Sequence, residues 1–445
     1  MFTLTKDTKI PPVEKTVSIL QRHADDIGVP LDYDRMQEYI AYYTIAADNL
    51  IYQIIQATIP DGSRPKVTDY KDSHFISFLD KVNCTKYLDK TPKGAVSLGE
   101  DSIKAAIAKE IIPKEIADIM TLYSKVKSYR QLISPFTNIL QEYGIVNWET
   151  YDNHRMLLVK PIAVPQITGR VGYQSPAITN FGRDVQDIIT VPKGWVKCEA
   201  DSGQIDPRIS QSWYIHDPQL IKCTNMYNDA YYGYLHYCCW LTDEERASGT
   251  LDLKPREITD EMKAQRKEFK TFGNAVMYGS TENRLGNPNK ASFIRYIGGH
   301  PERVKRQQLV ENQVMRGDYI FYTYFGTPVD IMSGPSAQED LKHSADEQFR
   351  RRVNRGINAP IQGTAADLFR YSVMKADNLL TREAPNSRII AYVHDSGKFM
   401  IAEDEYDKVI DQIKEIVSYQ VEDWIPIYGD YEEGVHIKNL KRFLA

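Results

Sequence analysis

Apolar side chains recur with helical spacing in the first third of the chain. Between residues 34 and 60 they stand three and four positions apart, which places them on one face of an α-helix. This stripe consists of Met36, Ile40, Tyr43, Ala47, Leu50 and Ile54. Asp34 and Gln37 resemble a capping box at the start of the helix, and Pro60 ends it. A second helical stretch at residues 118–142 could run back beside the first.

Two later segments favour strands. Residues 194–201 (GWVKCEAD) predict a strand that ends in the carboxylate of Asp201. Residues 388–402 (RIIAYVHDSGKFMIA) predict a hairpin with Asp395 in its turn. Between these segments the chain is mainly helical, and residues 364–380 predict one of the helices. The whole pattern predicts an α+β body with helical excursions.

The composition is that of an ordinary globular protein. Hydrophobic residues make up 42% and charged residues 26% of the 445 positions, which excludes a disordered tail, a collagen-like fibre and a disulfide scaffold. The length suggests about three domains. No apolar run is long enough for a membrane span, and the start, MFTLTKDTKI, lacks the apolar core of a secretory signal. The five cysteines lack metal-ligand spacing, so we expect free thiols in a reducing compartment.

Charge is distributed unevenly along the chain. Taken alone, the formal net charge of −5 argues against a nucleic-acid binder. Residues 254–306, however, contain 12 Lys and Arg against 6 Asp and Glu, whereas residues 403–433 contain 11 acidic residues against 2 Lys. This asymmetry allows a basic working surface on a mildly acidic protein, although two solvated helical faces of opposite sign explain it equally well.

Two carboxylates and two cations are candidates for a reactive site. Asp201 and Asp395 stand at the ends of separate predicted strands, where paired carboxylates can hold divalent metal, although either one alone is more typical of a turn. Arg266 and Lys270 are four positions apart, so they share one helix face and could grip phosphate oxygens. Metal-binding carboxylates beside a cationic clamp indicate phosphoryl transfer by two metal ions.

Six segments resemble, in family order, those of the family A (DNA polymerase I-like) DNA polymerases. Three are similar to the family's motifs A, B and C, namely DSGQIDPR at 201–208, RKEFKTFGNAVMYG at 266–279 and VHDS at 393–396. The others resemble its TGR…P…N segment, its N-x-P-x-Q-G-T-A-A-D-L helix and the opening of its thumb, namely TGR at 168–170 with Pro176 and Asn180, NAPIQGTAADL at 358–368 and GVPLD at 28–32. The resemblance covers the chain from about residue 12 to its end.

The resemblance implies a role for each matching residue. The catalytic residues would be Asp201, Asp395 and Lys270, and the two aspartates would hold two Mg²⁺ ions, for which Mn²⁺ can substitute. The nucleotide-binding residues would be Arg266, Lys270, Asp206, Asn274, Tyr278 and Gln204. The residues at the primer–template would be Arg170, Asn180, Gln362, His394, Tyr278 and Gly279. Hydrogen-bond donors can test base-pair geometry in the minor groove without reading sequence, because every pair offers an N3 or O2 acceptor there.

The chain departs from the family pattern at several positions. These are Ser202 for Tyr, Asp206 for Glu, Pro207 for Leu, Tyr231 for His, Asn274 for an aromatic residue and Ser396 for Glu. HDS in motif C and YGS in motif B also resemble the single-subunit phage RNA polymerases, whereas the QGTAADL and TGR segments do not. Sugar selectivity is the property that these changes affect most.

The implied fold is a right hand with thumb, palm and fingers and an antiparallel palm sheet. The expected parts are an N-terminal segment and thumb (1–150), a first palm part with motif A (151–225), fingers with motif B (226–349) and a second palm part with motif C (350–445). Only about 12 residues precede the thumb-like segment, so we expect a phage-like polymerase module without an exonuclease domain and without proofreading.

The implied function is template-directed, primer-dependent DNA synthesis, for instance in DNA replication. The expected partners are primer–template DNA and dNTPs, without a membrane, and separate replication proteins could join them. The expected location is the cytoplasm, or the host cytoplasm if a phage encodes the chain. The alternatives are a ribonucleotide-tolerant or RNA-synthesising polymerase and a non-catalytic primer–template binding subunit.

Overall fold

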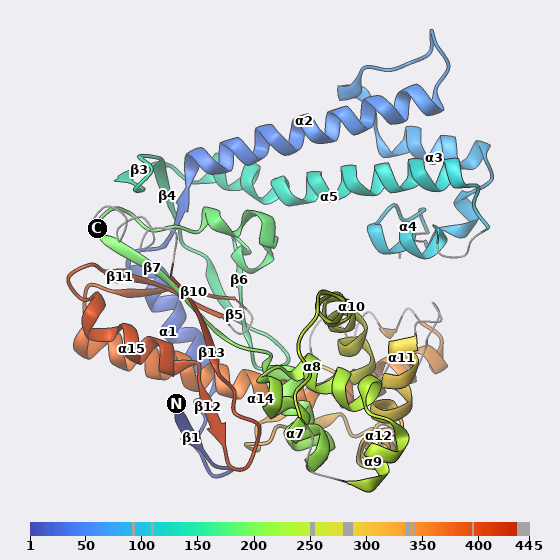
Figure 1. Cartoon of the computed structure of the whole chain (residues 1–445). Coiled ribbons are helices and arrows are strands. Elements are labelled where there is room, and N and C mark those ends of the chain that lie inside the picture. The colour runs from blue at the N-terminus through green and yellow to red at the C-terminus, as the bar shows by residue number, and fades with distance from the viewer. Residues whose placement is uncertain are drawn as a thin grey trace. The chain divides into compact units, whose positions relative to one another are not determined.

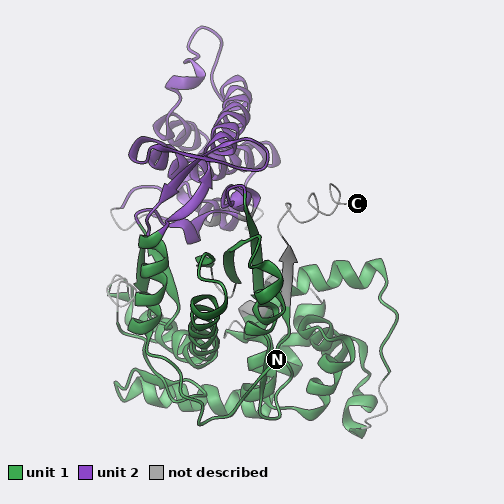
Figure 2. Ribbon diagram, turned by 90° about the vertical axis from the view of Figure 1, so that its left-hand side faces the viewer, with its two compact units in different colours: residues 1–26, 162–174, 194–445 green, residues 27–161, 175–193 purple. Residues whose placement is uncertain are grey.

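The computed structural model (Figure 1) describes residues 1–90, 94–107, 111–249, 254–278, 288–333, 340–341, 343–393 and 396–433. The chain forms two compact units (Figure 2). Unit 1 consists of Met1–Asp26, Ile162–Gln174 and Gly194–Ala445, and unit 2 of Ile27–Pro161 and Ser175–Lys193. The sequence-based division assigns residues 1–26 to the thumb segment, whereas the structure groups them with unit 1. Among the residues that the structure describes, every helix is too short or too polar to cross a lipid bilayer.

Unit 2 is mainly helical, with one three-stranded antiparallel sheet in the order β2-β4-β3. Its α-helices are α2 (Tyr33–Thr58), α3 (Asp72–Lys81), α4 (Glu100–Ile107) and α5 (Lys114–Glu142). Its short helices are η1 (Val67–Asp69), η2 (Thr85–Tyr87), η3 (Ile178–Asn180) and η4 (Arg183–Ile188). Its strands are β2 (Val29–Asp32), β3 (Ile145–Glu149) and β4 (Arg155–Val159). The long helices α2 and α5 lie side by side (Figure 1), which confirms the expected helix pair.

One apolar core joins the helices of unit 2. Ile51 and Ile54 of α2 are fully buried with Phe75 of α3 and Tyr123 of α5. The rings of Phe75 and Tyr123 stack with their centroids 3.8 Å apart. Burying one side chain of this size stabilises a fold by about 1.5–3 kcal/mol. The apolar stripe of the sequence is therefore the face that holds α2 against its neighbours.

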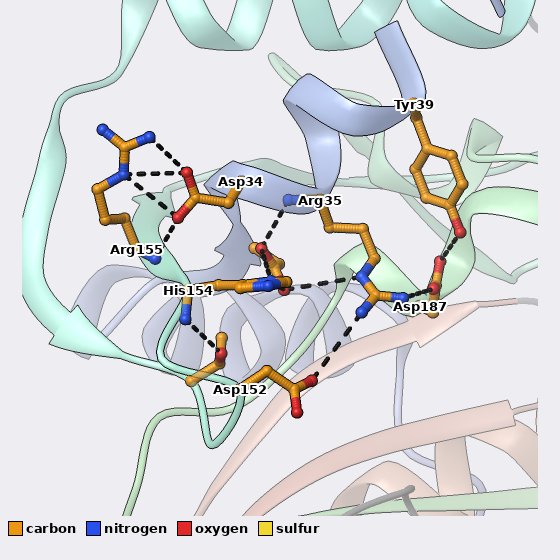
Figure 3. Close-up of polar contacts among 9 residues, drawn as sticks. Asp34, Arg35, Tyr39, Asp152, His154, Arg155 and Asp187 are labelled. Atoms are coloured by element: carbon orange, nitrogen blue, oxygen red, sulfur yellow. Dashed lines mark hydrogen bonds and ion pairs between the residues drawn. The ribbon is translucent and has the colours of Figure 1, made fainter. Parts of the chain in front are cut away.

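The start of α2 differs from the sequence-based prediction. The N-cap is Asp32, whose side chain accepts a hydrogen bond from the backbone N–H of Arg35 at 2.9 Å. The predicted capping box of Asp34 and Gln37 is wrong, because β2 extends to Asp32 and the chain enters the helix directly after it. Asp34 lies in the first turn, and its carboxylate binds the guanidinium group of Arg155 on β4 (Figure 3).

A polar network fastens this helix end to the rest of unit 2 (Figure 3). The Nδ1 atom of His154 lies 3.0 Å from Oδ2 of the buried Asp32 carboxylate. Arg35 reaches Oδ2 of Asp187 at 3.0 Å, and the hydroxyl group of Tyr39 donates to the other oxygen of Asp187 at 2.8 Å. The hydrogen bond to Asp32 raises the pKa of His154 above its usual value, although burial opposes this.

We expect the stability of unit 2 to fall as pH rises, through His154. Its pKa is raised in the folded state, so its contribution is fully present below the unfolded pKa of about 6.5 and is lost as pH rises through the folded pKa. NMR titration should place the pKa of the His154 ring above about 6.5 in the wild type and closer to that value in Asp32→Asn. An identical titration in the two proteins would show that the carboxylate does not hold the ring.

Unit 1 contains a four-stranded antiparallel sheet in the order β10-β11-β7-β13. Its strands are β7 (Trp195–Ser202), β10 (Arg388–Val393), β11 (Ser396–Ala402) and β13 (Gly429–Glu433). The helices α1 (Val13–Asp26), α14 (Ala345–Glu383) and α15 (Tyr406–Ile416) contact this sheet. The strand expected at residues 194–201 and the hairpin expected at 388–402 are thus confirmed as β7 and β10–β11.

The remaining elements of unit 1 are small sheets and helices. Three two-stranded sheets pair β1 (Phe2–Leu4) with β12 (Tyr419–Val421), β5 (Ile162–Pro165) with β6 (Val171–Gln174), and β8 (Ile320–Tyr322) with β9 (Pro328–Asp330). The helices between β7 and α14 are α6 (Ile205–Ile209), η5 (Ser210–Ile215), α7 (Pro218–Tyr227), α8 (Ala230–Leu235), η6 (His236–Trp240), α9 (Asp243–Ser248), α10 (Asp260–Met277), α11 (Pro288–Phe293), η7 (Ile294–Gly298) and α12 (Pro301–Met315).

The central helix α14 is longer than its sequence predicts. The expectation of a helix over residues 364–380 is correct for that part, but α14 begins at Ala345 and passes through Pro360. A proline inside a helix removes one backbone hydrogen bond and weakens the helix. Here Ile357 and Ile361, on either side of it, are buried in the main core of unit 1. Tertiary packing therefore outweighs the local preference.

A second core in unit 1 holds α10 in place. Phe269 of α10 is fully buried, and its ring lies 4.7 Å from that of Phe293 on α11 and 5.9 Å from that of Tyr234 on α8. Aromatic contacts of this kind add about 0.5–1.5 kcal/mol beyond the burial of apolar area. The helix that carries Arg266 and Lys270 is thus firmly packed on α8 and α11.

Candidate active site

Asp201 lies near the end of β7, a central strand of the sheet. Side chains alternate along this strand between a buried face and a more exposed one, and Asp201 is on the exposed face. Its ladder partners are Ser396 at the start of β11 and Asp430 on β13. A carboxylate at this place is rigidly held by the sheet but accessible to a ligand.

Three polar residues surround this position on the same face of the sheet. Glu199 precedes Asp201 by two residues and pairs with the buried Lys398 of β11, whose Nζ atom is 2.6 Å from Glu199 Oε2. The hydroxyl group of Ser396 donates to Glu199 Oε1 at 2.9 Å. Burial raises the pKa of Glu199, but Lys398 and Ser396 outweigh it, so its pKa is lower than usual and the carboxylate stays charged.

Four expected site residues lie wholly or partly outside the described part of the chain. Asp395, His394 and Gly279 lie outside the described residues, and so does the side chain of Asn274. In the sequence, Asp395 directly precedes Ser396, the ladder partner of Asp201.

Four expected site residues from distant parts of the chain lie close together at α6, the helix that contains Asp206. The carboxylate of Asp206 accepts a hydrogen bond from the hydroxyl group of Tyr278 at 2.7 Å and one from Arg170 Nη2 at 3.3 Å. The side chain of Gln362, on α14, lies within interaction distance of the Tyr278 hydroxyl group. Burial and the Asp206 charge raise the pKa of Tyr278 well above its usual value, so the hydroxyl group remains a donor.

Arg266 belongs to a second group, also in unit 1. Its Nε and Nη2 atoms bind Oδ2 of Asp229 at 2.9 and 2.5 Å. Gln204, which follows β7, donates to the same oxygen at 2.7 Å. Lys270, one turn further along α10, is exposed to solvent. Asn180 is exposed too, but it belongs to unit 2, whereas the other described candidates belong to unit 1.

Sequence reasoning did not select Glu199 or Asp229 as site residues. Glu199 could have been found from the period of two along a strand, which puts it on the face of Asp201. Asp229 opens α8 as its N-cap, with Oδ1 accepting from Tyr232 N at 2.9 Å. A capping aspartate predicts a helix start, but it gives no indication of a pairing with Arg266, which is 37 positions away.

The residues at Asp201 offer part of a divalent-metal site. Asp201 offers carboxylate oxygens, the ligands that hard cations such as Mg²⁺ prefer. Among the described residues, no three His, Cys, Asp or Glu side chains come together as a metal site. Asp201 therefore suits one ligand position, and the second expected ligand is Asp395.

The chain is similar in sequence to known proteins. The family model described as DNA polymerase family A matches residues 76–437. DNA polymerase I of Caldicellulosiruptor bescii is 25% identical over 443 residues, which cover 95% of this chain and 46% of that protein. DNA polymerase I of Aquifex aeolicus is 23% identical over 341 residues, covering 74% and 50%. The chain thus spans half or less of the length of these relatives.

The fold also has a counterpart among solved structures. The POL domain of Pol1 from M. smegmatis, in complex with DNA primer-template and dNTP, superposes with a TM-score of 0.69 and 19% identity. The match covers 95% of this chain and 69% of that one. It confirms the expected α+β, right-hand polymerase fold. Since the family model also matches most of the sequence, the chain belongs to DNA polymerase family A.

Proposed function

We propose that this chain is a template-directed, primer-dependent DNA polymerase that adds dNTPs to a primer end. The observation that carries the proposal is the meeting of Arg170, Asp206, Tyr278 and Gln362 at one place in unit 1. These residues come from four separate segments that resemble polymerase motifs. Relatives named DNA polymerase I, and a structural neighbour in complex with DNA primer-template and dNTP, support the same activity.

In the proposed reaction Asp201 and Asp395 would hold two Mg²⁺ ions. Bound ions of this kind stabilise the charge on the attacking and leaving oxygens of a phosphoryl transfer. Asp201 provides a ligand that the sheet fixes in place, because both neighbouring strands pair with its residue. The pre-set position lowers the cost of ordering the site when the substrate arrives.

The basic residues of α10 bind the triphosphate in this proposal. Lys270 is exposed and carries a mobile ammonium group, so it can follow the phosphate oxygens. Arg266 is more fixed, through Asp229. Both charges offset the negative charge that develops on the phosphates during transfer.

Primer extension with defined templates tests the proposal against its alternatives. Purified protein is offered a DNA or an RNA template, a matched primer, Mg²⁺, and either dNTPs or rNTPs. We expect efficient extension on the DNA template with dNTPs. A preference for rNTPs would favour an RNA-synthesising polymerase, and tight primer–template binding without any extension would favour a non-catalytic subunit.

We further propose that Asp206 selects against ribose less strictly than glutamate does. It is shorter than glutamate by one methylene, which opens a gap of ~1.5 Å, about one bond length. Hydrogen bonds from Tyr278 and Arg170 fix the position of its carboxylate. Small pocket changes of this type shift selectivity by roughly 10- to 200-fold.

The ratio of kcat/KM for dCTP to that for CTP tests this second proposal. Asp206→Glu should raise the ratio by roughly 10-fold or more, and Asp206→Ala should lower it. Tyr278→Phe, which removes only the hydroxyl group that holds Asp206, should also lower it. A wild-type ratio that is already high, together with poor use of dCTP by Asp206→Glu, would show that the pocket is built around aspartate.

A further inference from the structure

Arg266 is held in one pose by three neighbouring residues. Its Nε and Nη2 atoms both bind Asp229 Oδ2, at 2.9 and 2.5 Å. Its guanidinium carbon lies 5.4 Å from the ring centroids of Tyr231 and of Tyr232. The Arg266 side chain is 30% exposed and that of Asp229 is 14% exposed, so the ion pair is largely shielded from water. An ion pair of this kind is stronger than one on an open surface.

Asp229 is itself immobilised from two sides. Its Oδ1 atom caps α8 by accepting from the backbone N–H of Tyr232 at 2.9 Å. Its Oδ2 atom also accepts from Gln204 Nε2 at 2.7 Å, and Gln204 Oε1 in turn accepts from the backbone N–H of Ala230 at 2.6 Å. The carboxylate is thus part of the frame of α8 and cannot swing with the arginine.

Gln204 connects this group to the strand of Asp201. It follows the end of β7 by two residues and has a left-handed backbone conformation, with φ of 57°. A non-glycine residue in this conformation is strained, so it persists only where the surroundings fix it. The two hydrogen bonds to Asp229 and Ala230 are such a constraint. Gln204 and Asp229 therefore fix the position of Arg266 relative to the end of β7.

We propose that Asp229 is a positioning residue that fixes the guanidinium group of Arg266 for the phosphates of an incoming nucleoside triphosphate. This inference rests on the proposed function. Asp229 occupies the Nε and Nη2 edge of Arg266, which leaves the Nη1 side of the group available to phosphate oxygens. Tyr231 and Tyr232 hold the plane of the group by cation–π contact. The fixed pose lowers the entropy that Arg266 loses when the phosphate binds.

The test variant is Asp229→Asn, which removes the charge but can still cap α8, because asparagine is also a good N-cap. Asp229→Ser, which retains a capping oxygen, is the second variant if the first folds poorly. Asp217→Asn is the matched control. Asp217 likewise caps a helix of unit 1, α7, and lies 3.3 Å from Nε2 of His300, and its described contacts do not include Arg266.

Two readouts separate a positioning role from a merely structural one. The first is inhibition of primer extension by inorganic triphosphate, together with KM and kcat for a dNTP. Asp229→Asn should raise the inhibition constant and KM by roughly 10-fold with a smaller change in kcat, since displacement of a group by about 1 Å can cost up to 10²-fold. The second is a double-mutant cycle, in which Asp229→Asn should add no further loss in an Arg266→Ala background. Asp217→Asn should change none of these values.

Calorimetric binding of inorganic triphosphate to the DNA-free protein keeps this inference distinct from the proposed function. A wild-type protein that extends primers, with an Asp229→Asn variant of unchanged triphosphate affinity, would overturn the inference alone. Equal losses in the wild-type and Arg266→Ala backgrounds would also overturn it, since Asp229 would then act elsewhere. Weaker triphosphate binding by Asp229→Asn would support the inference even if no primer were extended. In that case only the proposed function would be wrong.

Discussion

Replacing Asp201 by asparagine is expected to reduce nucleotide addition by about 10³-fold or more while leaving primer–template binding nearly unchanged. The substitution keeps the size of the side chain but removes the charge that holds a metal ion, and such ions supply several kcal/mol of transition-state stabilisation. Each 1.36 kcal/mol corresponds to a factor of about 10 in rate. The same loss is expected for Asp395→Asn. Single-turnover addition of one nucleotide, with DNA affinity measured in parallel, gives both values.

The matched control for this prediction is Asp411→Asn. Asp411 lies on α15 in the same unit, is 93% exposed and pairs with Lys414 at 3.5 Å. A change there should alter the rate of addition by less than about 2-fold, as for most surface substitutions. Near-normal addition by Asp201→Asn would contradict the role of Asp201 as a metal ligand. A parallel loss in Asp411→Asn would show that the assay reports general damage.

The second large effect is expected from Lys270→Ala. Removal of one charge from the place where negative charge develops typically costs ~3 kcal/mol, or a factor of about 100 in rate. The effect should appear mainly in the maximal rate of addition, because the phosphate charge is greatest in the transition state. The measurement is the dependence of the single-turnover rate on dNTP concentration.

Lys263→Ala is the control for Lys270→Ala. Lys263 lies on the same helix, seven positions earlier, is 63% exposed and pairs with Asp260 at 2.9 Å. Both variants remove one positive charge from α10, so a general loss of attraction for DNA or nucleotide would affect them equally. Similar rates for the two variants would mean that Lys270 does not bind the phosphates of the incoming nucleotide.

The elements that build the site could be predicted from local pattern. Strand β7 and the hairpin of β10 and β11 are recognisable because apolar residues alternate with polar ones along β7 and run almost continuously through β10. The length of α14 was not, because Pro360 signals an interruption and only burial in the core of unit 1 overrides it. The cap of α2 was misplaced by two residues, since both Asp32 and Asp34 are suitable capping residues in the sequence.

The contacts between site residues depend on tertiary structure. Asp206 and Tyr278 are 72 positions apart, and Arg266 and Asp229 are 37 apart, so no local rule pairs them. The resemblance to a family placed Asp206 and Tyr278 at one site, because both match its motifs. It gave no reason to pair Arg266 with Asp229, or Glu199 with Ser396. Those pairs follow from the register of the sheet and from the turn at Gln204.

The most direct test of template-directed DNA synthesis is the addition of a single nucleotide to an end-labelled primer on four templates that differ only in the first unpaired base. Each template is offered each dNTP separately, with Mg²⁺, by the wild type and by Asp201→Asn. We expect the wild type to add only the complementary nucleotide on every template, and Asp201→Asn to add almost none. Addition of the same nucleotide whatever the template base, or no addition on any template, would contradict the account.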